Sequence, residues 1–374
     1  MISAEGIRKI RIAFVLNVGY SLFREEVQET YGGGQIDLYL LAQELKNIGR
    51  YDVSMLFLDY GQPPQETVDG IRLYKTYRPR RSGGLVLQFF AAFWRLWLAL
   101  RRANADIYFH ESAEFEISVT RIFCFFYKKK FVYRCANIID VDGRYHREHP
   151  WHGRLFSFGL AGANAIIAQT KDQALLLEQK GFMVTIIGNM FPFHPRSPSN
   201  KTNIIWVGRM TKIKHPEIFL RLAENFPKQH FLLLGPIDSI DQDFARSIQK
   251  QAKTLLNVNY IDKIPFRKTP EIFDQAKILV NTSEYEGFPV TFVQAMCHGV
   301  PVLTMGIDPD QVVSKVCGLV AKDEQELCQK LMLLLEPKTW ATYSQASLKH
   351  AADHFSPAVI IPKYERVFYN IISP

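Results

Sequence analysis

The stretch ILVNTSEYEGFPVTFVQAM, residues Ile278 to Met296, predicts a strand, a turn and a helix in direct succession. The ILV at its start is apolar enough for a buried strand, EGF at 286–288 supplies the turn, and Pro289 suits the first turn of a helix. Val290 and Gln294 are four residues apart and share one face of that helix. A buried strand that turns directly into a helix is typical of parallel α/β sheets, whose ligands bind at such turns.

Strands and helical patterns alternate on both sides of this stretch, so an α/β fold is expected for the whole chain. The expected strands are Ile10–Leu16, Asp52–Tyr60, Asp106–His110, Phe131–Asn137, Asn164–Thr170, Thr185–Asn189, Ile204–Met210, His230–Pro236, Val258–Ile264, Ile278–Ser283 and Val300–Met305. Residues 191–203 are rich in proline, serine and asparagine and predict a linker. We therefore expect two doubly wound, Rossmann-like domains, 1–190 and 204–356, that face each other across a cleft. A final helix, 357–374, is expected to pack back on the first domain.

The composition indicates which classes of binding partner and which cellular compartment to expect. With 374 residues, 47% of them hydrophobic, the chain can form two domain cores. Its 45 lysines and arginines exceed its 37 aspartates and glutamates, which favours anionic partners such as phosphates, nucleotides or an anionic membrane surface. The five cysteines show no CxxC pair, so neither a zinc site nor a disulfide framework is indicated. The first residues show no signal-peptide pattern, so a cytoplasmic protein is expected.

Two aromatic and basic runs lie in the first half of the chain. Leu85–Leu100 is shorter than the ~20 residues that span a bilayer, and it contains Gln88 and Arg95. Its aromatic residues are Phe89, Phe90, Phe93, Trp94 and Trp97. With a second run at 121–131, they could place regions 78–102 and 121–131 on the inner face of an anionic membrane. The alternative is a helix that packs on a sheet.

Two further loops carry residue types that suit phosphate binding. Arg209 and Lys214 follow the strand IIWV and flank the start of a helical pattern, where two cations beside a helix N-terminus would bind a diphosphate. The alternative is a solvated basic loop. Tyr31–Asp37, YGGGQID, precedes an apolar helical stripe, and its glycines permit close backbone approach. It is not a GxGxxG fingerprint, so a nicotinamide cofactor is not indicated.

Together these segments resemble the retaining glycosyltransferases of family 4, a part of glycosyl transferases group 1 with the GT-B fold of two Rossmann-like domains. The resemblance rests on GGGQ before the first long helix, on VGRMTKIK, and above all on EGFPVTFVQAMCHGVPVL from Glu286 onward. It covers nearly the whole chain. It implies hexosyl transfer from a nucleotide sugar, a UDP-sugar or a GDP-sugar, to a hydroxyl group of a glycan or lipid-linked glycan precursor. Cell-surface polysaccharide or glycoconjugate synthesis is the implied setting, with no metal ion, no further cofactor and no nucleic acid.

The resemblance also implies roles for individual residues. Arg209 and Lys214 would neutralise the donor diphosphate, and Glu286 would hydrogen-bond hydroxyls of the transferred sugar. Gly33 and Gly34 would approach the phosphates from the first domain. The remaining donor-binding positions would be Gly287, Phe288, Pro289, Val290 and Gln294.

Two of the implied roles are less direct. His110, at the end of a strand, matches the place of a polar group near the sugar. Gln294 stands where the family usually has a second glutamate, which looks like the clamp for the ribose. An amide can still bind a ribose diol, with a loss of about 1 kcal/mol relative to a carboxylate.

Other interpretations stay open. Asp140 and Asp142 could hold a divalent ion in a metal-dependent transferase. A further metal face could form from His146, His149 and His152, although Pro150 between them favours a polar loop. The chain could also be a membrane-associated scaffold with an impaired GT-B site. A further alternative is a nucleotide-sugar hydrolase or epimerase.

Overall fold

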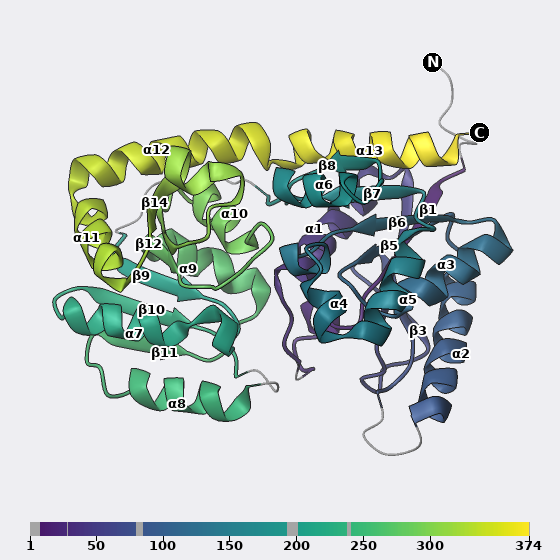
Figure 1. Cartoon of the computed structure of the whole chain (residues 1–374), viewed down its shortest axis with the longest axis horizontal. Coiled ribbons are helices and arrows are strands. Elements are labelled where there is room, and N and C mark those ends of the chain that lie inside the picture. Colours follow the sequence, from purple (N-terminus) through teal and green to yellow (C-terminus); the bar gives the residue numbers. More distant parts are fainter. Residues whose placement is uncertain (1–7, 28, 80–84, 193–200, 238–240, 374) are drawn as a thin grey trace. The chain divides into compact units, whose positions relative to one another are not determined.

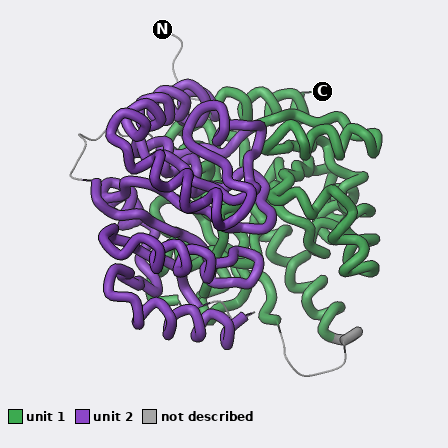
Figure 2. The backbone as a smooth tube through the Cα atoms, turned by 60° about the vertical axis from the view of Figure 1, so that its left-hand side comes forward, with its two compact units in different colours: residues 1–187, 361–374 green, residues 188–360 purple. Residues whose placement is uncertain are grey.

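The computed structural model describes residues 8–27, 29–79, 85–192, 201–237 and 241–373 (Figure 1). It divides the chain into two compact units, shown in different colours in Figure 2. Unit 1 comprises Met1–Ile187 and Ile361–Pro374, and unit 2 comprises Gly188–Ile360. Each unit has its own sheet and its own helices.

Unit 1 contains, among the described residues, an eight-stranded sheet with the order β3-β4-β2-β1-β5-β6-β7-β8. Its strands are β1 (Ile10–Val15), β2 (Tyr51–Phe57), β3 (Gln65–Val68), β4 (Ile71–Lys75), β5 (Ile107–Glu111), β6 (Lys130–Arg134), β7 (Ala165–Ala168) and β8 (Val184–Ile186). All neighbouring pairs are parallel except β3 and β4, which are antiparallel at one edge. Because β1 lies between β2 and β5, the direction of winding reverses there, and parallel sheets bind ligands at such a point.

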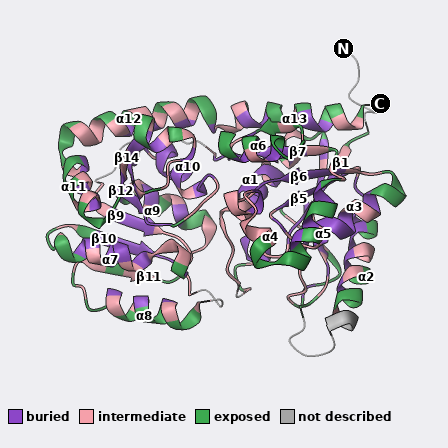
Figure 3. Cartoon of the chain, viewed as in Figure 1, coloured by how far each residue is buried: buried purple, intermediate pink, exposed green. Residues whose placement is uncertain are grey.

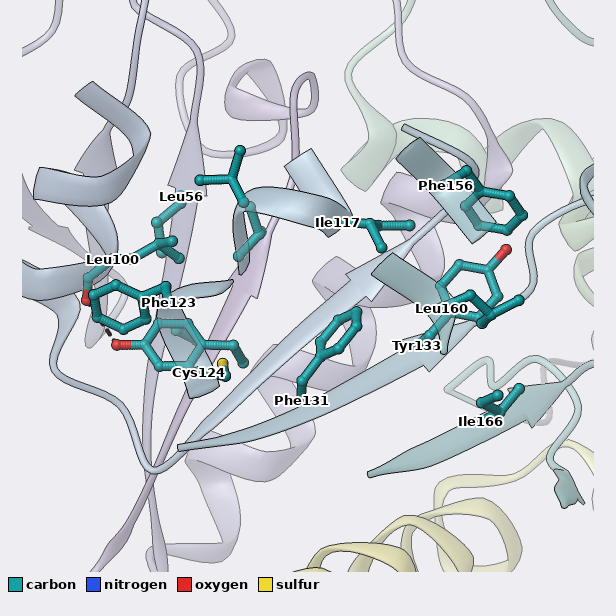
Figure 4. Packing of buried hydrophobic residues seen from close by; sticks show 14 of the residues in the cluster. Leu56, Leu100, Ile117, Phe123, Cys124, Phe131, Tyr133, Phe156, Leu160 and Ile166 are labelled. Carbon is teal, nitrogen blue, oxygen red and sulfur yellow. Dashed lines mark hydrogen bonds between the residues drawn. The ribbon is translucent and has the colours of Figure 1, made fainter. Parts of the chain in front are cut away.

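The helices of unit 1 follow the strands in alternation. They are α1 (Gly33–Ile48), α2 (Leu85–Ala103), α3 (Glu116–Tyr127), α4 (Arg144–Glu148), α5 (Pro150–Leu160), α6 (Lys171–Glu178) and most of α13 (Pro357–Ile372), with short 3-10 turns η1 (Tyr20–Leu22) and η2 (Ile138–Asp140). On one face of the sheet, Leu100 from α2, Ile117 and Phe123 from α3, and Phe156 from α5 join Phe131 from β6 in one buried cluster (Figure 4). This cluster holds α2, α3 and α5 on the sheet.

Residues 361–374 complete unit 1 through a second set of aromatic contacts. The ring of Phe109 in β5 lies 6.1 Å from that of Tyr364 and 6.4 Å from that of Phe368, and both of these α13 side chains are buried. Glu365 adds a 2.8 Å ion pair with Arg50. The end of α13 therefore belongs to the core of unit 1, although all of unit 2 precedes it in the sequence.

Unit 2 contains a six-stranded sheet in its described part, with the order β11-β10-β9-β12-β13-β14 and parallel pairing throughout. The strands are β9 (Asn203–Val207), β10 (His230–Leu234), β11 (Val258–Ile261), β12 (Ala276–Asn281), β13 (Val302–Met305) and β14 (Gly318–Ala321). The helices are α7 (Pro216–Asn225), α8 (Gln242–Ala252), α9 (Thr269–Gln275), α10 (Val290–Cys297), α11 (Glu324–Leu335) and α12 (Pro337–His354), with shorter turns η3 (Lys212–Lys214), η4 (Phe266–Lys268), η5 (Pro309–Gln311) and η6 (Val313–Cys317). Ile204, Phe219 and Phe231 lie in its buried core.

The division into units differs slightly from the expected domain boundaries. The first unit ends after Ile187, three residues before the expected end at 190, and the second begins at Gly188. Of the expected linker 191–203, residues 193–200 lie outside the described part of the chain, and the remaining residues belong to unit 2. Among the helices that the structure describes, none combines the length and the apolar character needed to cross a bilayer.

Candidate functional site

Two loops of unit 2 meet at the carboxyl ends of adjacent strands. β9 and β12 are paired, and the loops that follow them, 208–215 and 282–289, lead into α7 and α10. The backbone N–H of Glu284 donates to the carbonyl of Ile213 at 2.9 Å, and the Thr282 hydroxyl donates to the carbonyl of Lys214 at 2.7 Å. The Trp206 indole N–H donates to the same hydroxyl oxygen at 3.0 Å. These bonds fix one loop against the other.

Lys214 and Glu286 form an ion pair across the two loops. Both side chains are largely but not fully buried, with 19% and 13% of their side-chain surface exposed, so a ligand can still reach them. Asn281, at the end of β12, also contacts Glu286, because its Nδ2 lies 3.5 Å from the Glu286 carboxylate. The amide of Asn281 is itself held by the Ser283 N–H and the Thr304 hydroxyl, which both donate to its oxygen.

The N-termini of α7 and α10 lie at the same two loops. α7 starts with Pro216 after His215, and α10 starts with Val290 after Pro289. Within the described residues, neither N-cap residue, His215 or Pro289, caps its helix with a side-chain hydrogen bond. Uncapped N–H groups and the helix dipoles give this edge of the sheet a positive potential, which suits phosphate oxygens.

Arg209 lies between β9 and η3, half-buried and five residues before Lys214. Its carbonyl oxygen accepts a hydrogen bond from the Thr211 N–H at 2.9 Å, which tightens the loop. The structure thus brings Arg209, Lys214 and Glu286 onto two loops that contact each other, together with the backbone of 287–290. The alternative of a fully solvated basic loop is not what the structure shows.

Gln294 lies one turn inside α10 with only 2% of its surface exposed. Its backbone carbonyl accepts from His298, but its side-chain Nε2 has no hydrogen-bond partner within the described part of the chain. A buried polar group without a partner costs about 1–3 kcal/mol. A ligand oxygen that reached Nε2 would recover this free energy.

Gly33 and Gly34 begin α1 in unit 1, where the Gly32 N–H donates to the Gln35 side chain at 2.9 Å. A Cβ atom at position 34 would lie 2.5 Å from Oε2 of Glu111 in β5. Any larger residue at position 34 would therefore clash with the side chain of Glu111, which belongs to the same unit. The predicted approach of Gly33 and Gly34 to phosphate groups bound in unit 2 stays a prediction.

Glu111 belongs to a buried charge network that the sequence analysis missed. The fully buried guanidinium of Arg134 pairs with Glu111 and, at 2.8 Å, with Asp37 of α1. Burial raises the pKa of Glu111 to about 7, and the adjacent Arg134 opposes this shift. Removing one member of such a network leaves an uncompensated buried charge, which costs about 3–5 kcal/mol. The network ties α1 to β5 and β6.

His110 is buried at the end of β5. Its side chain is fully buried, its Nε2 lies 2.7 Å from the Thr120 hydroxyl of α3, and its ring packs on Phe131. Burial lowers the pKa of His110 to about 3, so the imidazole is neutral. The side chain contacts α3, and the predicted role near the sugar stays a prediction.

Asp140, Asp142 and His146, which belong to the two alternative metal sites, each have protein partners in the structure. Asp140 accepts hydrogen bonds from the backbone of 136 and 137, and burial raises its pKa to about 6. Asp142 pairs with Arg144 at 2.6 Å. His146 contacts the Ser157 hydroxyl at 2.6 Å instead of the other histidines. No group of three or more metal-ligating side chains occurs among residues that the structure describes.

Asn281 and Thr282 are site residues that the sequence analysis did not single out. Both are polar and buried directly at the end of the apolar run ILV, which is the position where open α/β sheets place ligand-binding groups. That signal was present in the sequence.

Comparison with solved structures identifies the architecture. Sucrose-phosphate synthase from Thermosynechococcus elongatus superposes with a TM-score of 0.80 at 16% identity, over 98% of this chain and all of that one. HepE from Anabaena, in complex with UDP and glucose, superposes with a TM-score of 0.75 at 17% identity, with the same coverage of both chains. The chain has the GT-B fold. At these identities the likeness concerns the GT-B fold alone.

Sequence comparison points to the same unit as the site geometry. A family model described as "Glycosyl transferases group 1" matches residues 201–337, which lie within unit 2 of this GT-B chain and contain both loops. Among curated proteins, the amylovoran biosynthesis glycosyltransferase AmsD of Erwinia amylovora is 23% identical over 227 residues. The match covers 57% of this chain and 64% of AmsD, so it spans less than two thirds of that relative.

Proposed function

We propose that this protein is a retaining glycosyltransferase of family 4 that transfers a hexosyl group from a nucleotide sugar to an acceptor hydroxyl group. The observation that carries the proposal is the contact between the two loops of unit 2, with Lys214 and Glu286 paired beside the N-termini of α7 and α10. The match of 201–337 to the group 1 family supports it, because that match includes every residue of this constellation.

Arg209 and Lys214 would bind the diphosphate of the donor. As the bond from the sugar to the diphosphate breaks, negative charge grows on the leaving oxygen, and fixed cations and helix N–H groups stabilise that charge most. With this charge supplied by the protein, we propose transfer without a metal ion. The acceptor oxygen forms the new bond on the face that the diphosphate leaves, and the acceptor proton passes to the departing diphosphate. We assign no protein nucleophile.

Glu286 and Gln294 would bind the two ends of the donor. Sugar hydroxyls would donate to the Glu286 carboxylate, which Asn281 keeps in place. The ribose would lie beside Gln294, where one hydroxyl oxygen would accept from the unpartnered Nε2. HepE was solved with UDP and glucose, which favours a UDP-sugar as donor over a GDP-sugar.

For the acceptor, only the class of molecule is proposed. AmsD is named for amylovoran biosynthesis, which supports a growing glycan or a lipid-linked glycan precursor as the acceptor and cell-surface polysaccharide or glycoconjugate synthesis as the setting. The acceptor would bind to unit 1.

A thermal-shift screen without metal tests the donor site. UDP, GDP, ADP and their common sugar conjugates are added to wild type and to Arg209→Ala, with Lys212→Ala as the matched control, since Lys212 is an exposed cation in the same loop. One nucleotide is expected to stabilise wild type and Lys212→Ala alike. Arg209→Ala is expected to bind it about 10–100-fold more weakly, as for the loss of a charge-assisted hydrogen bond.

The same screen includes Gln294→Glu. A carboxylate at this buried position destabilises the nucleotide-free protein. In the complex, hydrogen bonds from the ribose hydroxyls would offset this loss of stability. Nucleotide is therefore expected to raise the unfolding midpoint of Gln294→Glu more than that of wild type. A protein that responds to no nucleotide in any variant would contradict the proposal. Release of free sugar at the same rate with and without acceptors would indicate a hydrolase instead.

A further inference from the structure

The two aromatic and basic runs of the first half come together in space. α2 packs on α3, and Trp97 of α2 is the central contact, with its ring 5.1 Å from Phe123 and 6.3 Å from Phe126. Leu96 and Leu100 of α2 are fully buried in the core cluster of unit 1. The outer sides of the two helices therefore form one continuous surface of unit 1.

Large aromatic side chains of this surface are exposed to solvent. Figure 3 colours the described residues of α2 and α3 by their burial. Phe90 and Trp94 are 64% and 59% exposed, and they lie one helical turn apart on α2. Phe125 and Phe126, at the end of α3, are 80% and 69% exposed, and their rings are 5.7 Å apart. Single exposed apolar residues are common on soluble proteins, but a contiguous aromatic group marks an interaction site.

Cations surround these aromatic residues. Arg95, Arg101 and Arg102 are exposed on α2, and Lys128 is exposed directly after α3. α2 contains no acidic residue, and α3 has none after its first residue, Glu116. Lys129 is not counted among these cations, because its ammonium group lies 3.7 Å from the Asp106 carboxylate, which neutralises its charge. We call the combined surface the aromatic-basic face; it consists of Phe90, Trp94, Arg95, Arg101, Arg102, Phe125, Phe126 and Lys128.

We propose that the aromatic-basic face docks unit 1 onto an anionic lipid bilayer, with the aromatic rings at the headgroup boundary and the cations against lipid phosphates. A helix with one side buried in protein and the other side aromatic and cationic is suited to lie in a membrane interface. A second copy of the chain fits less well, because a two-fold contact through this face would bring the same cations against each other without acidic partners. The proposal goes beyond the donor site, which lies in unit 2.

Vesicle co-sedimentation tests the proposal with two kinds of vesicle, one of phosphatidylcholine alone and one of phosphatidylcholine and phosphatidylglycerol in equal parts. Wild type is expected to bind the anionic vesicles at least ~10-fold more tightly than the neutral ones. Two variants probe the face: Trp94→Ser/Phe125→Ser/Phe126→Ser, and Arg95→Gln/Arg101→Gln/Arg102→Gln/Lys128→Gln. Each is expected to lose at least ~10-fold in affinity for the anionic vesicles.

The matched control is Leu175→Ser/Met183→Ser, which removes two exposed apolar side chains of unit 1 away from α2 and α3. The control is expected to bind like wild type. Unfolding midpoints check that each variant is folded, and the nucleotide thermal shift of unit 2 is expected to be unchanged in all of them, so failure here is distinguishable from failure of the donor site. Equal vesicle binding by wild type and both face variants would overturn the proposal. So would a wild-type dimer in light scattering that only the aromatic variant abolishes.

Discussion

At the scale of single residues, Asn281 contacts Glu286 in addition to the ion pair that Glu286 forms with Lys214. Its Nδ2 lies 3.5 Å from the Glu286 carboxylate, and its own oxygen is fixed by two donors. Asn281→Ala is expected to lower turnover about 5–30-fold, equivalent to about 1–2 kcal/mol for a lost hydrogen bond. Asn281→Asp is expected to be worse, because it places a second carboxylate beside Glu286. Steady-state kcat and KM with the donor identified by the screen check both variants, and an Asn281→Asp enzyme as active as wild type would contradict this role.

His110 makes folding stability depend on pH. Its pKa is about 3 in the folded protein and about 6.5 in the unfolded chain, so between these values only the unfolded chain binds the proton. Stability therefore falls as the pH drops below about 6.5, by up to ~1.4 kcal/mol per pH unit. Urea unfolding of wild type and of His110→Leu/Thr120→Val checks this.

The expected difference appears between about pH 7 and pH 5, where wild type is expected to lose more stability than the double variant. The other histidines contribute equally to both proteins and cancel in the comparison. Parallel pH curves would show that the imidazole is not buried in its neutral form.

The site could be predicted where its residues are close together in the sequence. Arg209 and Lys214 share one loop, and Glu286 and Gln294 share one turn and helix, so their spacing made them candidates and the family resemblance supplied their expected roles. The link between Lys214 and Glu286 depends on β9 and β12 being neighbours, which local patterns do not contain. The burial of His110 could not be predicted, because β5 is buried along its whole length, and such a strand does not reveal toward which face a residue points.

At the scale of elements, α2 shows two tryptophans with different roles three residues apart. Trp97 contacts Phe123 and Phe126 across the α2–α3 interface, whereas Trp94 faces solvent. Trp97→Ala is expected to cost about 2–3 kcal/mol of folding stability, and Trp94→Ala no more than about 0.5 kcal/mol. Chemical denaturation of the two single variants measures the difference. Equal losses would mean that α2 does not pack on α3 through Trp97.

Most of the strands could be predicted. Apart from β4, every strand inside the two sheets overlaps an expected strand. β3 and β4 were missed because QETV and IRLYK carry charged and polar residues, and β14 was missed because GLVA is only four residues long. The run 121–131 was read as one segment, but it contains the end of α3, a turn at Lys128 with φ 52°, and the start of β6.

At the scale of the whole molecule, unit 1 depends on residues that follow unit 2 in the sequence. Phe368 is fully buried, with its ring 6.3 Å from Tyr51 and 6.4 Å from Phe109. Phe368→Ala is expected to cost about 3–5 kcal/mol and to lower the unfolding midpoint of unit 1 by about 10 °C. The adjacent Tyr369→Ala is the matched control, since Tyr369 is 41% exposed, and its cost is expected to stay below about 1 kcal/mol.

Calorimetry with and without the nucleotide separates the two units in this experiment. Nucleotide stabilises the unit that binds it, so under the proposed function the transition that moves with ligand belongs to unit 2. Phe368→Ala is expected to move the other transition. If it moved the ligand-sensitive transition instead, the assignment of 361–374 to unit 1 would be wrong.

The late position of residues 361–374 has a consequence for how the chain is made. A ribosome that has finished residue 187 must still translate residues 188–360 before the segment that covers Phe109 is available, which takes roughly 10–30 s at bacterial speeds. During that time the first-made sheet keeps an apolar face open, while all residues of the second-made unit are already present before 361 emerges. We therefore expect the unit encoded second to mature first, and the nascent first unit to be the part of this protein that needs a chaperone.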